Sequence, residues 1–199
     1  YTTMVDKYEA KKYVAERIGE EYIIPTLGVW NHFDEIDFNA LPDQFVLKCT
    51  HDSGGLVICT DKSKFDREVA RKKIEHSLKR NFYWFGREWP YKNVPARIIA
   101  EKYMSEEKKD TVSTFNEING GLRDYKLYCF DGKVKLYLVT TDRSKGATTG
   151  DYFDEQNRHL DLIWGFPNAK TIPDVPNNIE KMKELAEILA AGIPQLRVD

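Results

Sequence analysis

The sequence lacks a long hydrophobic run, an excess of charge of either sign and the dense cysteine content of a disulfide-stabilised protein. No stretch approaches the ~20 apolar residues that cross a bilayer, and the first residues contain neither the basic segment nor the apolar core of a secretion signal. Thirty basic and 32 acidic side chains give a net charge of -2, which provides no electrostatic footprint for nucleic acid. We therefore expect a cytoplasmic protein with no transmembrane segment and no nucleic-acid partner.

Cysteine is scarce, and its three positions argue against cross-linking. Cys49, Cys59 and Cys129 are odd in number, and each lies inside an apolar run. This pattern predicts buried, reduced thiols. A chain of 199 residues buries roughly 70% of its unfolded surface, so it needs neither disulfides nor a structural metal to hold its core.

Hydrophobic periodicity predicts alternating helices and strands. Helical spacing occurs over residues 3–18, 63–80 and 179–191, and glycine or polar residues follow each segment. Strand-like runs are predicted at residues 44–50, 56–60, 97–103, 125–130 and 134–139, with a further strand beginning near the last residues. Residues 143–178 are predicted to consist mainly of loops. The order predicts an α+β protein with two lobes that join near Tyr103.

The clearest local signal is the dipeptide Asp131-Gly132 between two apolar runs. A type I′ turn requires positive φ at both central residues, and Asp-Gly is a favoured pair for it. This pattern predicts a β-hairpin.

Lys48 is unusual because it lies within the apolar run of residues 45–50. Burying a lysine there would cost several kcal/mol unless an anion meets it. His51, Ser53, Gly54 and Gly55 follow, and a loop of this composition can offer backbone and side-chain donors to a phosphate. The arrangement is typical of a nucleotide triphosphate site, although it matches neither a P-loop nor a Rossmann motif. A solvent-facing lysine beside an ordinary hairpin turn explains these residues equally well.

Two acidic side chains follow the apolar strand that ends at Glu101, Lys102 and Tyr103. A segment leaving a strand between two lobes can present its backbone to an adenine edge. Glu106 or Glu107 can then hold ribose hydroxyls. A solvated acidic loop is the simpler explanation when the segment is considered alone.

Charged residues also alternate along two further strands. Asp124 and Lys126 project from one face of a strand, with Arg143 beyond the end of its hairpin partner. Arg197 and Asp199 are likewise two residues apart and share a face. Asp199 could ligate Mg²⁺ while Arg197 steadies a transferring phosphoryl group. An exposed sheet face accounts for the first pair almost as well.

These segments together resemble the ATP-grasp superfamily, and within it the TupA-like proteins associated with teichuronopeptide and other surface-polysaccharide biosynthesis. The resemblance runs from about Val5 to Asp199. The segments that carry it are residues 6–8, 24–30, 41–55, 86–91, 98–103, 124–126 and 197–199.

The resemblance implies an ATP-dependent carboxylate–amine ligase in which two α+β lobes with antiparallel sheets grip ATP. A carboxylate attacks the γ-phosphate to give an acylphosphate, and an amine then forms the amide. ATP and Mg²⁺ are the implied cofactors, and the implied partners are a carboxylate and an amine, one of them a glycan or peptide precursor.

The resemblance also implies a role for each candidate residue. Lys48 would hold the α- and β-phosphates, under a lid formed by residues 51–55, and the backbone of residues 101–103 would meet adenine. Glu106 or Glu107 would hold the ribose, and Asp124 with Lys126 would form the phosphate floor. Arg143 would meet the acylphosphate or acceptor, and Arg197 and Asp199 the transition state and metal.

We expect three parts: an N-terminal helix and connector over residues 1–40, a small nucleotide-lid lobe over 41–103, and a large lobe over 104–199. The large lobe is expected to be incomplete, because the family carries further Glu and Asn metal ligands on a following strand; some residues are also expected to precede Tyr1. The resemblance implies that a fragment lacking these ligands could be inactive.

Two other functions stay open at this point: a kinase-like phosphotransferase or a glycosyltransferase of a polysaccharide cluster, and a non-catalytic nucleotide-binding module. Neither protein-kinase motifs nor an Asp-X-Asp motif is present. The aromatic cluster within residues 82–91 is expected to pack beneath the small lobe, with a sugar platform as the alternative.

Overall fold

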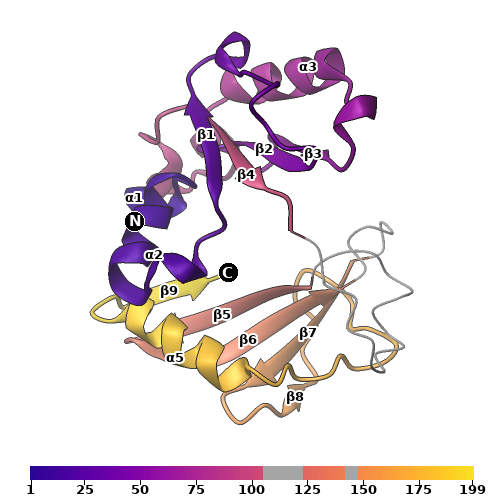
Figure 1. Ribbon diagram of the computed structural model, residues 1–199. Coiled ribbons are helices and arrows are strands. Elements are labelled where there is room, and N and C mark those ends of the chain that lie inside the picture. Colours follow the sequence, from indigo (N-terminus) through magenta and orange to yellow (C-terminus); the bar gives the residue numbers. More distant parts are fainter. Residues whose placement is uncertain (105–122, 142–147) are drawn as a thin grey trace. The chain divides into compact units, whose positions relative to one another are not determined.

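The computed structural model describes residues 1–104, 123–141 and 148–199 (Figure 1). They form two compact units, Tyr1–Met104 and Ser105–Asp199. Each unit combines helices with an antiparallel sheet, so the fold class is α+β, as the sequence predicts. Within these ranges, no helix is long and apolar enough to cross a membrane.

The first unit contains a four-stranded sheet with the order β1-β4-β2-β3. Its strands are antiparallel and comprise β1 (Thr26–Trp30), β2 (Phe45–Cys49), β3 (Leu56–Cys59) and β4 (Ile98–Lys102). The side chains of Phe45 and Leu47 are fully buried on one face, where Ile74 of α3 (Arg67–Leu78) joins the core. Because side chains alternate along a strand, Val46 and Lys48 belong to the opposite face.

The N-terminal helix is interrupted, and the prediction of one continuous helix is wrong. Two helices occur, α1 (Thr2–Val5) and α2 (Glu9–Ile18). Between them Asp6 is only 2% exposed, its carboxylate accepts hydrogen bonds from the backbone N–H groups of Tyr8 and Glu9, and it forms an ion pair of 2.7 Å with Arg97. A side chain that caps backbone donors in this way starts a new helix.

Short helices complete the first unit: η1 (Glu20–Tyr22), η2 (Phe33–Glu35), η3 (Lys62–Lys64), α4 (Tyr83–Gly86) and η4 (Trp89–Tyr91). The helix expected to start at Ser63 begins instead at Arg67, because the carboxylate of Asp66 caps it through Glu68 and Val69. Asp61 caps the separate turn η3 through Ser63.

The second unit contains a five-stranded antiparallel sheet with the order β8-β7-β6-β5-β9. Its strands are β5 (Asp124–Phe130), β6 (Lys133–Thr141), β7 (Thr149–Asp154), β8 (His159–Leu160) and β9 (Gln195–Val198). Helix α5 (Ile179–Ala190) lies along one face, where Ala186 packs with Leu127 and Tyr137 (Figure 1). The opposite face is free of this helix.

The hairpin predicted from Asp131-Gly132 is confirmed. Asp131 and Gly132 have φ values of 48° and 75°, as a type I′ turn requires, and they join β5 to β6. The expectation for residues 143–178 is wrong in part, because this range contains β7 and β8. Tyr152 and Phe153 of β7 are buried, and pairing with β6 makes that segment a strand although polar residues surround it.

All three cysteines are buried and free of disulfides, which confirms the prediction for Cys49, Cys59 and Cys129. Burial raises the pKa of the Cys49 thiol to about 11, and a hydrogen bond from Ser77 only partly opposes this effect. Burial likewise raises the pKa of Cys129 to about 11. Both thiols therefore stay protonated at neutral pH, which makes them poor nucleophiles.

Candidate functional site

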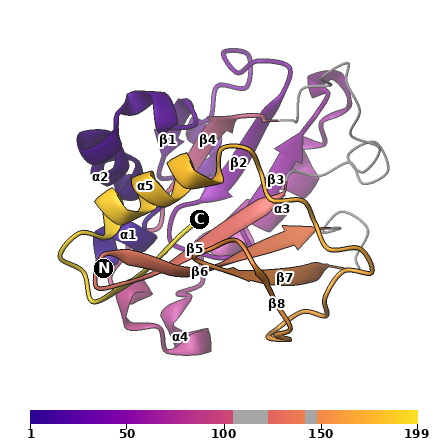
Figure 2. The same ribbon diagram turned by 90° about the horizontal axis from the view of Figure 1, so that it is seen from below.

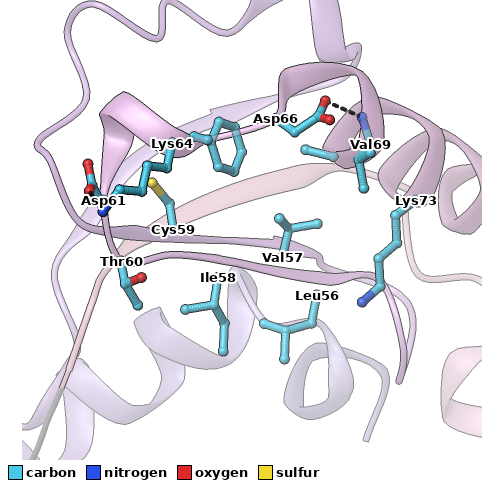
Figure 3. A pocket seen from close by; sticks show the side chains of 12 residues that line it. Leu56, Val57, Ile58, Cys59, Thr60, Asp61, Lys64, Asp66, Val69 and Lys73 are labelled. Atoms are coloured by element: carbon cyan, nitrogen blue, oxygen red, sulfur yellow. Dashed lines mark hydrogen bonds and ion pairs between the residues drawn. The ribbon is translucent and has the colours of Figure 1, made fainter.

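The face of the first sheet opposite α3 combines apolar and charged side chains, and it is exposed along β3 but buried along β4, where Ile99 and Glu101 are 0% and 4% exposed. In the strand register, Lys48 lies opposite Leu56 of β3 and Ile99 of β4, and Val46 lies opposite Ile58 and Glu101. Ile58 and Leu56 are 54% and 39% exposed. Figure 3 shows both side chains pointing to the side of β3 away from α3. The face thus offers an apolar surface next to a lysine.

Lys48 belongs to a three-residue ion cluster, the Lys11–Glu101–Lys48 cluster. The Glu101 carboxylate is 2.5 Å from Nζ of Lys48 and 2.7 Å from Nζ of Lys11. Glu101 is only 4% exposed, whereas the side chain of Lys48 is 28% exposed. Two ammonium groups share one carboxylate, so the cluster carries a net positive charge that an anion can neutralise.

The pKa of Glu101 reflects this environment. Burial alone would raise it, but hydrogen bonds and charge from Lys11 and Lys48 outweigh burial and hold the pKa below its ordinary value. The carboxylate therefore stays ionised at neutral pH.

Lys7 brings a third ammonium group close to the glycine-bearing loop. Its Nζ donates a hydrogen bond to the backbone carbonyl of Asp52. Burial lowers the pKa of Lys7, the Asp52 carboxylate opposes that effect, and the charge of Lys48 lowers the pKa further. The ammonium groups of Lys7 and Lys48 thus interact electrostatically. The positive charge at this end of β2 favours binding of a polyanion.

Sequence reasoning missed Lys7 and Lys11. Lys11 and Lys12 are adjacent, but Lys12 is mostly exposed and pairs with Glu9, whereas Lys11 reaches Glu101 on a distant strand. No local pattern distinguishes the two lysines. Only the ion pair of Lys11 with Glu101 of β4 separates them.

The loop after β2 contains a buried start and an exposed tip. His51 and Asp52 are 3% and 4% exposed, and the His51 Nε2 atom lies 3.0 Å from the carbonyl oxygen of Arg80. The other ring nitrogen, Nδ1, is buried without a hydrogen-bond partner among the described residues. The imidazole therefore ties the loop to the residues that follow α3, and its role as a phosphate donor stays a prediction. Ser53 and Gly54 form the exposed tip.

The two glycines of this loop have different reasons to be glycine. Neither Gly54 nor Gly55 has a positive φ, so backbone angles do not explain either glycine. A Cβ on Gly55 would lie 2.4 Å from the Ser77 Oγ and 2.8 Å from the Cys49 Sγ, whereas a Cβ on Gly54 would meet only an oxygen of Asp52 at 3.9 Å. Close packing therefore requires glycine at position 55, whereas position 54 has room for a Cβ.

Replacing Gly55 by alanine is expected to lower the free energy of unfolding by about 1–3 kcal/mol, because the added methyl group overpacks a buried contact. Urea denaturation followed by circular dichroism measures the change. Gly54→Ala is the matched control and is expected to alter stability by less than about 0.5 kcal/mol. Equal losses for the two variants would contradict the packing argument.

The segment predicted to meet adenine has one backbone donor already engaged. The N–H of Lys102 donates to the carbonyl of Pro25 at 3.0 Å, so this donor is not free for a base. Glu101 contributes its side chain to the Lys11–Glu101–Lys48 cluster in addition to any backbone role, and Tyr103 is half-buried. Glu106 and Glu107 lie outside the described residues.

The open face of the second sheet carries its own charge cluster. Lys126 Nζ lies 2.8 Å from a carboxylate oxygen of Asp124 and 2.8 Å from one of Asp199. Arg197 makes a two-point contact with Asp199, at 2.6 and 2.9 Å. The structure thus brings four of the predicted residues together, because β9 pairs with β5. Arg143 lies outside the described residues.

Aromatic residues flank this charge cluster, and the sequence did not single them out as part of the site. Tyr128 hydrogen-bonds Arg197, and burial together with the neighbouring Tyr128 raises the pKa of Tyr152 to about 12. Burial lowers the pKa of Arg197, but Asp199 outweighs it and the net pKa is raised. Trp164 stacks on Tyr152 with the ring planes 17° apart. The alternation of Lys126 and Tyr128 along β5 could have indicated from the sequence that Tyr128 shares a face with the charge cluster.

The acidic groups suit a metal that is also held by phosphates. No group of three metal-ligating side chains occurs in the described part of the chain. Mg²⁺ at nucleotide sites often takes only one or two carboxylates, with water and phosphate oxygens completing its shell. Asp199 and Asp124, which share Lys126, fit that limited role.

A hollow of about 580 Å³ lies between β3 and α3 (Figure 3), and its lining includes Leu56 and Ile58 of the sheet face described above. The lining also includes Val57, Thr60, Asp61, Val69 and Lys73 and contains none of the predicted site residues. The charge clusters, rather than this hollow, mark the candidate site.

Comparisons with known proteins bear on the family and the fold of this chain. A family model described as TupA-like ATPgrasp matches residues 1–199. A search of curated proteins found no match. Among solved structures, the crystal structure of D-alanine–D-alanine ligase from Bacillus anthracis superposes with a TM-score of 0.50 at 15% sequence identity. The superposition covers 99% of this chain and 52% of that chain, so this chain spans about half of the neighbour's length. The likeness supports an ATP-grasp fold.

Proposed function

This chain belongs to the TupA-like ATP-grasp family, and from that premise we propose that it is an ATP-dependent ligase that joins a carboxylate to an amine. The Lys11–Glu101–Lys48 cluster beside the exposed apolar side chains of β3 is the observation that carries the proposal. We further propose that the product belongs to a surface polysaccharide or teichuronopeptide, as the family resemblance suggests.

We assign ATP binding to the first unit. Leu56 and Ile58 provide exposed apolar area for the adenine ring, whose burial is favourable. Lys48 and Lys11 supply positive charge for the phosphates, and the exposed tip at Ser53 and Gly54 offers further donors. ATP phosphates would replace part of the interaction that Glu101 now makes with both lysines. Glu106 and Glu107 stay predictions for the ribose.

We assign the transferring phosphoryl group to the charges of the second unit. Lys126 and Arg197 would balance the charge that gathers on its oxygens, and Asp199 with Asp124 would hold Mg²⁺. The bound Mg²⁺ would neutralise phosphate charge. Arg143 stays a prediction for the acylphosphate or acceptor.

The chemistry consists of two displacements. A substrate carboxylate oxygen attacks the γ-phosphorus of ATP, the bond from this phosphorus to the bridging oxygen breaks, and ADP leaves. An acylphosphate remains. The amine nitrogen then attacks the acyl carbon, the carbon–oxygen bond to phosphate breaks, and the nitrogen loses a proton. Amide, ADP and inorganic phosphate are the products.

Hydroxylamine trapping tests this proposal. The chain would be incubated with Mg-ATP, hydroxylamine and a panel of amino acids, dicarboxylates and uronic acids, and hydroxamate and ADP would be measured. We expect equimolar hydroxamate and ADP with at least one carboxylate, and neither product above background with Lys48→Ala. A stable phosphorylated product without hydroxamate would instead identify a phosphotransferase. ATP binding without turnover on any carboxylate would identify a non-catalytic nucleotide-binding module if a longer chain that carries the expected Glu and Asn metal ligands behaved in the same way.

A further inference from the structure

An exposed group of aromatic and basic side chains, here called the aromatic–basic patch, lies around α4 and η4 and has no part in the proposed reaction. Its members are Arg80, Trp84, Phe85, Arg87, Trp89 and Lys92. Trp84, Phe85 and Trp89 are 62%, 73% and 64% exposed. The expectation that this cluster packs beneath the small lobe is therefore wrong for these three residues. Figure 2 shows α4 at the edge of the first unit.

The segment that carries the patch is closed at its base. The Asn81 side-chain amide donates to the carbonyl of Lys92 at 3.0 Å and accepts from the N–H of Tyr83 at 3.0 Å. Phe82 and Tyr91 pack edge to face with ring centroids 4.8 Å apart. These contacts hold residues 81 and 92 together, so the aromatic side chains between them are presented on a preformed turn.

The charge of this segment differs from that of the chain. Residues 79–92 contain four basic side chains and one acidic side chain, Glu88, whereas the whole chain has a net charge of -2. The local excess of +3 lies among the most exposed aromatic side chains of the first unit. A partner complementary to the patch therefore has a negatively charged surface and an apolar layer beneath that surface.

The basic groups lie over the aromatic rings. The Arg80 guanidinium is 4.5 Å from the ring centre of Phe85, that of Arg87 is 4.6 Å from Trp84, and the Lys92 ammonium is 4.8 Å from Trp89. Each of these rings thus has a cation on one face. Each cation is therefore placed to meet an anion next to an exposed apolar ring.

We propose that the aromatic–basic patch binds the surface of an anionic lipid bilayer. Tryptophan and phenylalanine side chains favour the interfacial zone of a membrane, where their rings are apolar and their edges meet polar headgroups. Arg80, Arg87 and Lys92 would pair with acidic headgroups at the same depth. Binding of this kind needs no transmembrane helix and does not depend on the proposed ligase activity.

Vesicle co-sedimentation tests the proposal. The 199-residue chain would be mixed with vesicles of phosphatidylcholine alone or with about one third phosphatidylglycerol at low salt. We expect binding to the anionic vesicles that exceeds binding to neutral vesicles by at least about tenfold and falls as salt rises. Equal binding to both vesicles, or binding to neither, would overturn the proposal.

Two variants separate the aromatic and the basic contributions. Arg87→Gln is expected to weaken binding to anionic vesicles about fivefold, the value for one basic side chain at such a surface. Trp84→Ser with Trp89→Ser is expected to weaken it at least tenfold. Circular dichroism checks the fold of each variant, and if the double variant fails to fold, Arg87→Gln decides the question alone.

Lys72→Gln and Lys73→Gln are matched controls, because both lysines are exposed on α3 away from the patch. We expect each control to bind anionic vesicles like the parent chain. A loss of vesicle binding as large as that of Arg87→Gln would mean that net charge alone governs binding. This result would overturn the assignment of binding to the patch. Quenching of tryptophan fluorescence by methyl glucuronide, without vesicle binding, would assign the patch to sugars and also overturn the proposal.

Discussion

Lys48→Ala is expected to weaken Mg-ATP binding by about 30- to 100-fold, equivalent to about 2–3 kcal/mol. The reason is the loss of one of the two ammonium groups that make the Lys11–Glu101–Lys48 cluster positive. The first unit should stay folded, because the Lys48 side chain is 28% exposed and Glu101 keeps its contact with Lys11. Isothermal titration calorimetry measures the affinity.

Lys64→Ala is the matched control for this experiment. Lys64 belongs to the same unit, but its side chain is 84% exposed and forms a surface ion pair with Asp61. We expect this variant to bind Mg-ATP like the parent chain. An unchanged affinity in Lys48→Ala would remove Lys48 from the nucleotide site.

Glu101→Gln is expected to lower the free energy of unfolding by about 3 kcal/mol at pH 7. Glu101 is 4% exposed between Lys11 and Lys48, so the uncharged amide would leave two neighbouring ammonium groups without their carboxylate. Urea denaturation of both chains measures the difference. Glu68→Gln, a change at a carboxylate that is 75% exposed, is the control and should cost less than about 0.5 kcal/mol.

The effect of Glu101 should depend on pH with a defined sign. The folded-state pKa of Glu101 lies below its ordinary value of 4.5 because Lys11 and Lys48 outweigh burial. Its contribution is therefore fully present above about pH 4.5 and is lost as the pH falls from there through the folded-state pKa. The stability gap between the parent chain and Glu101→Gln should narrow in acid. A gap that stays constant from pH 7 to acid would contradict the ion-cluster argument.

Local sequence patterns predicted those parts of the fold that depend on neighbouring residues. Asp131-Gly132 identified a hairpin because few residue pairs tolerate positive φ at two successive positions. Alternation identified β2, whose odd-numbered residues are buried. The spacing of Lys126, Arg197 and Asp199 likewise indicated which faces they share, and strand pairing brought them together.

Features that depend on contacts between residues far apart in the sequence could not be predicted from local patterns. The break between α1 and α2 requires Asp6 to meet Arg97, which lies 91 positions away. Lys11 reaches Glu101 through tertiary packing that its neighbours do not encode. Gly55 is also explained by a contact that is not local, because the side chain of Ser77 occupies the space that a Cβ would need.

The fate of a carboxylate oxygen tests the central claim most directly. A carboxylate selected by the hydroxylamine screen would be labelled with ¹⁸O and incubated with the chain, Mg-ATP and the amine, and the phosphate would be analysed by mass spectrometry. The acylphosphate route transfers one carboxylate oxygen to phosphorus, so we predict one ¹⁸O atom in each phosphate released with an amide. Unlabelled phosphate formed together with the amide would contradict the account.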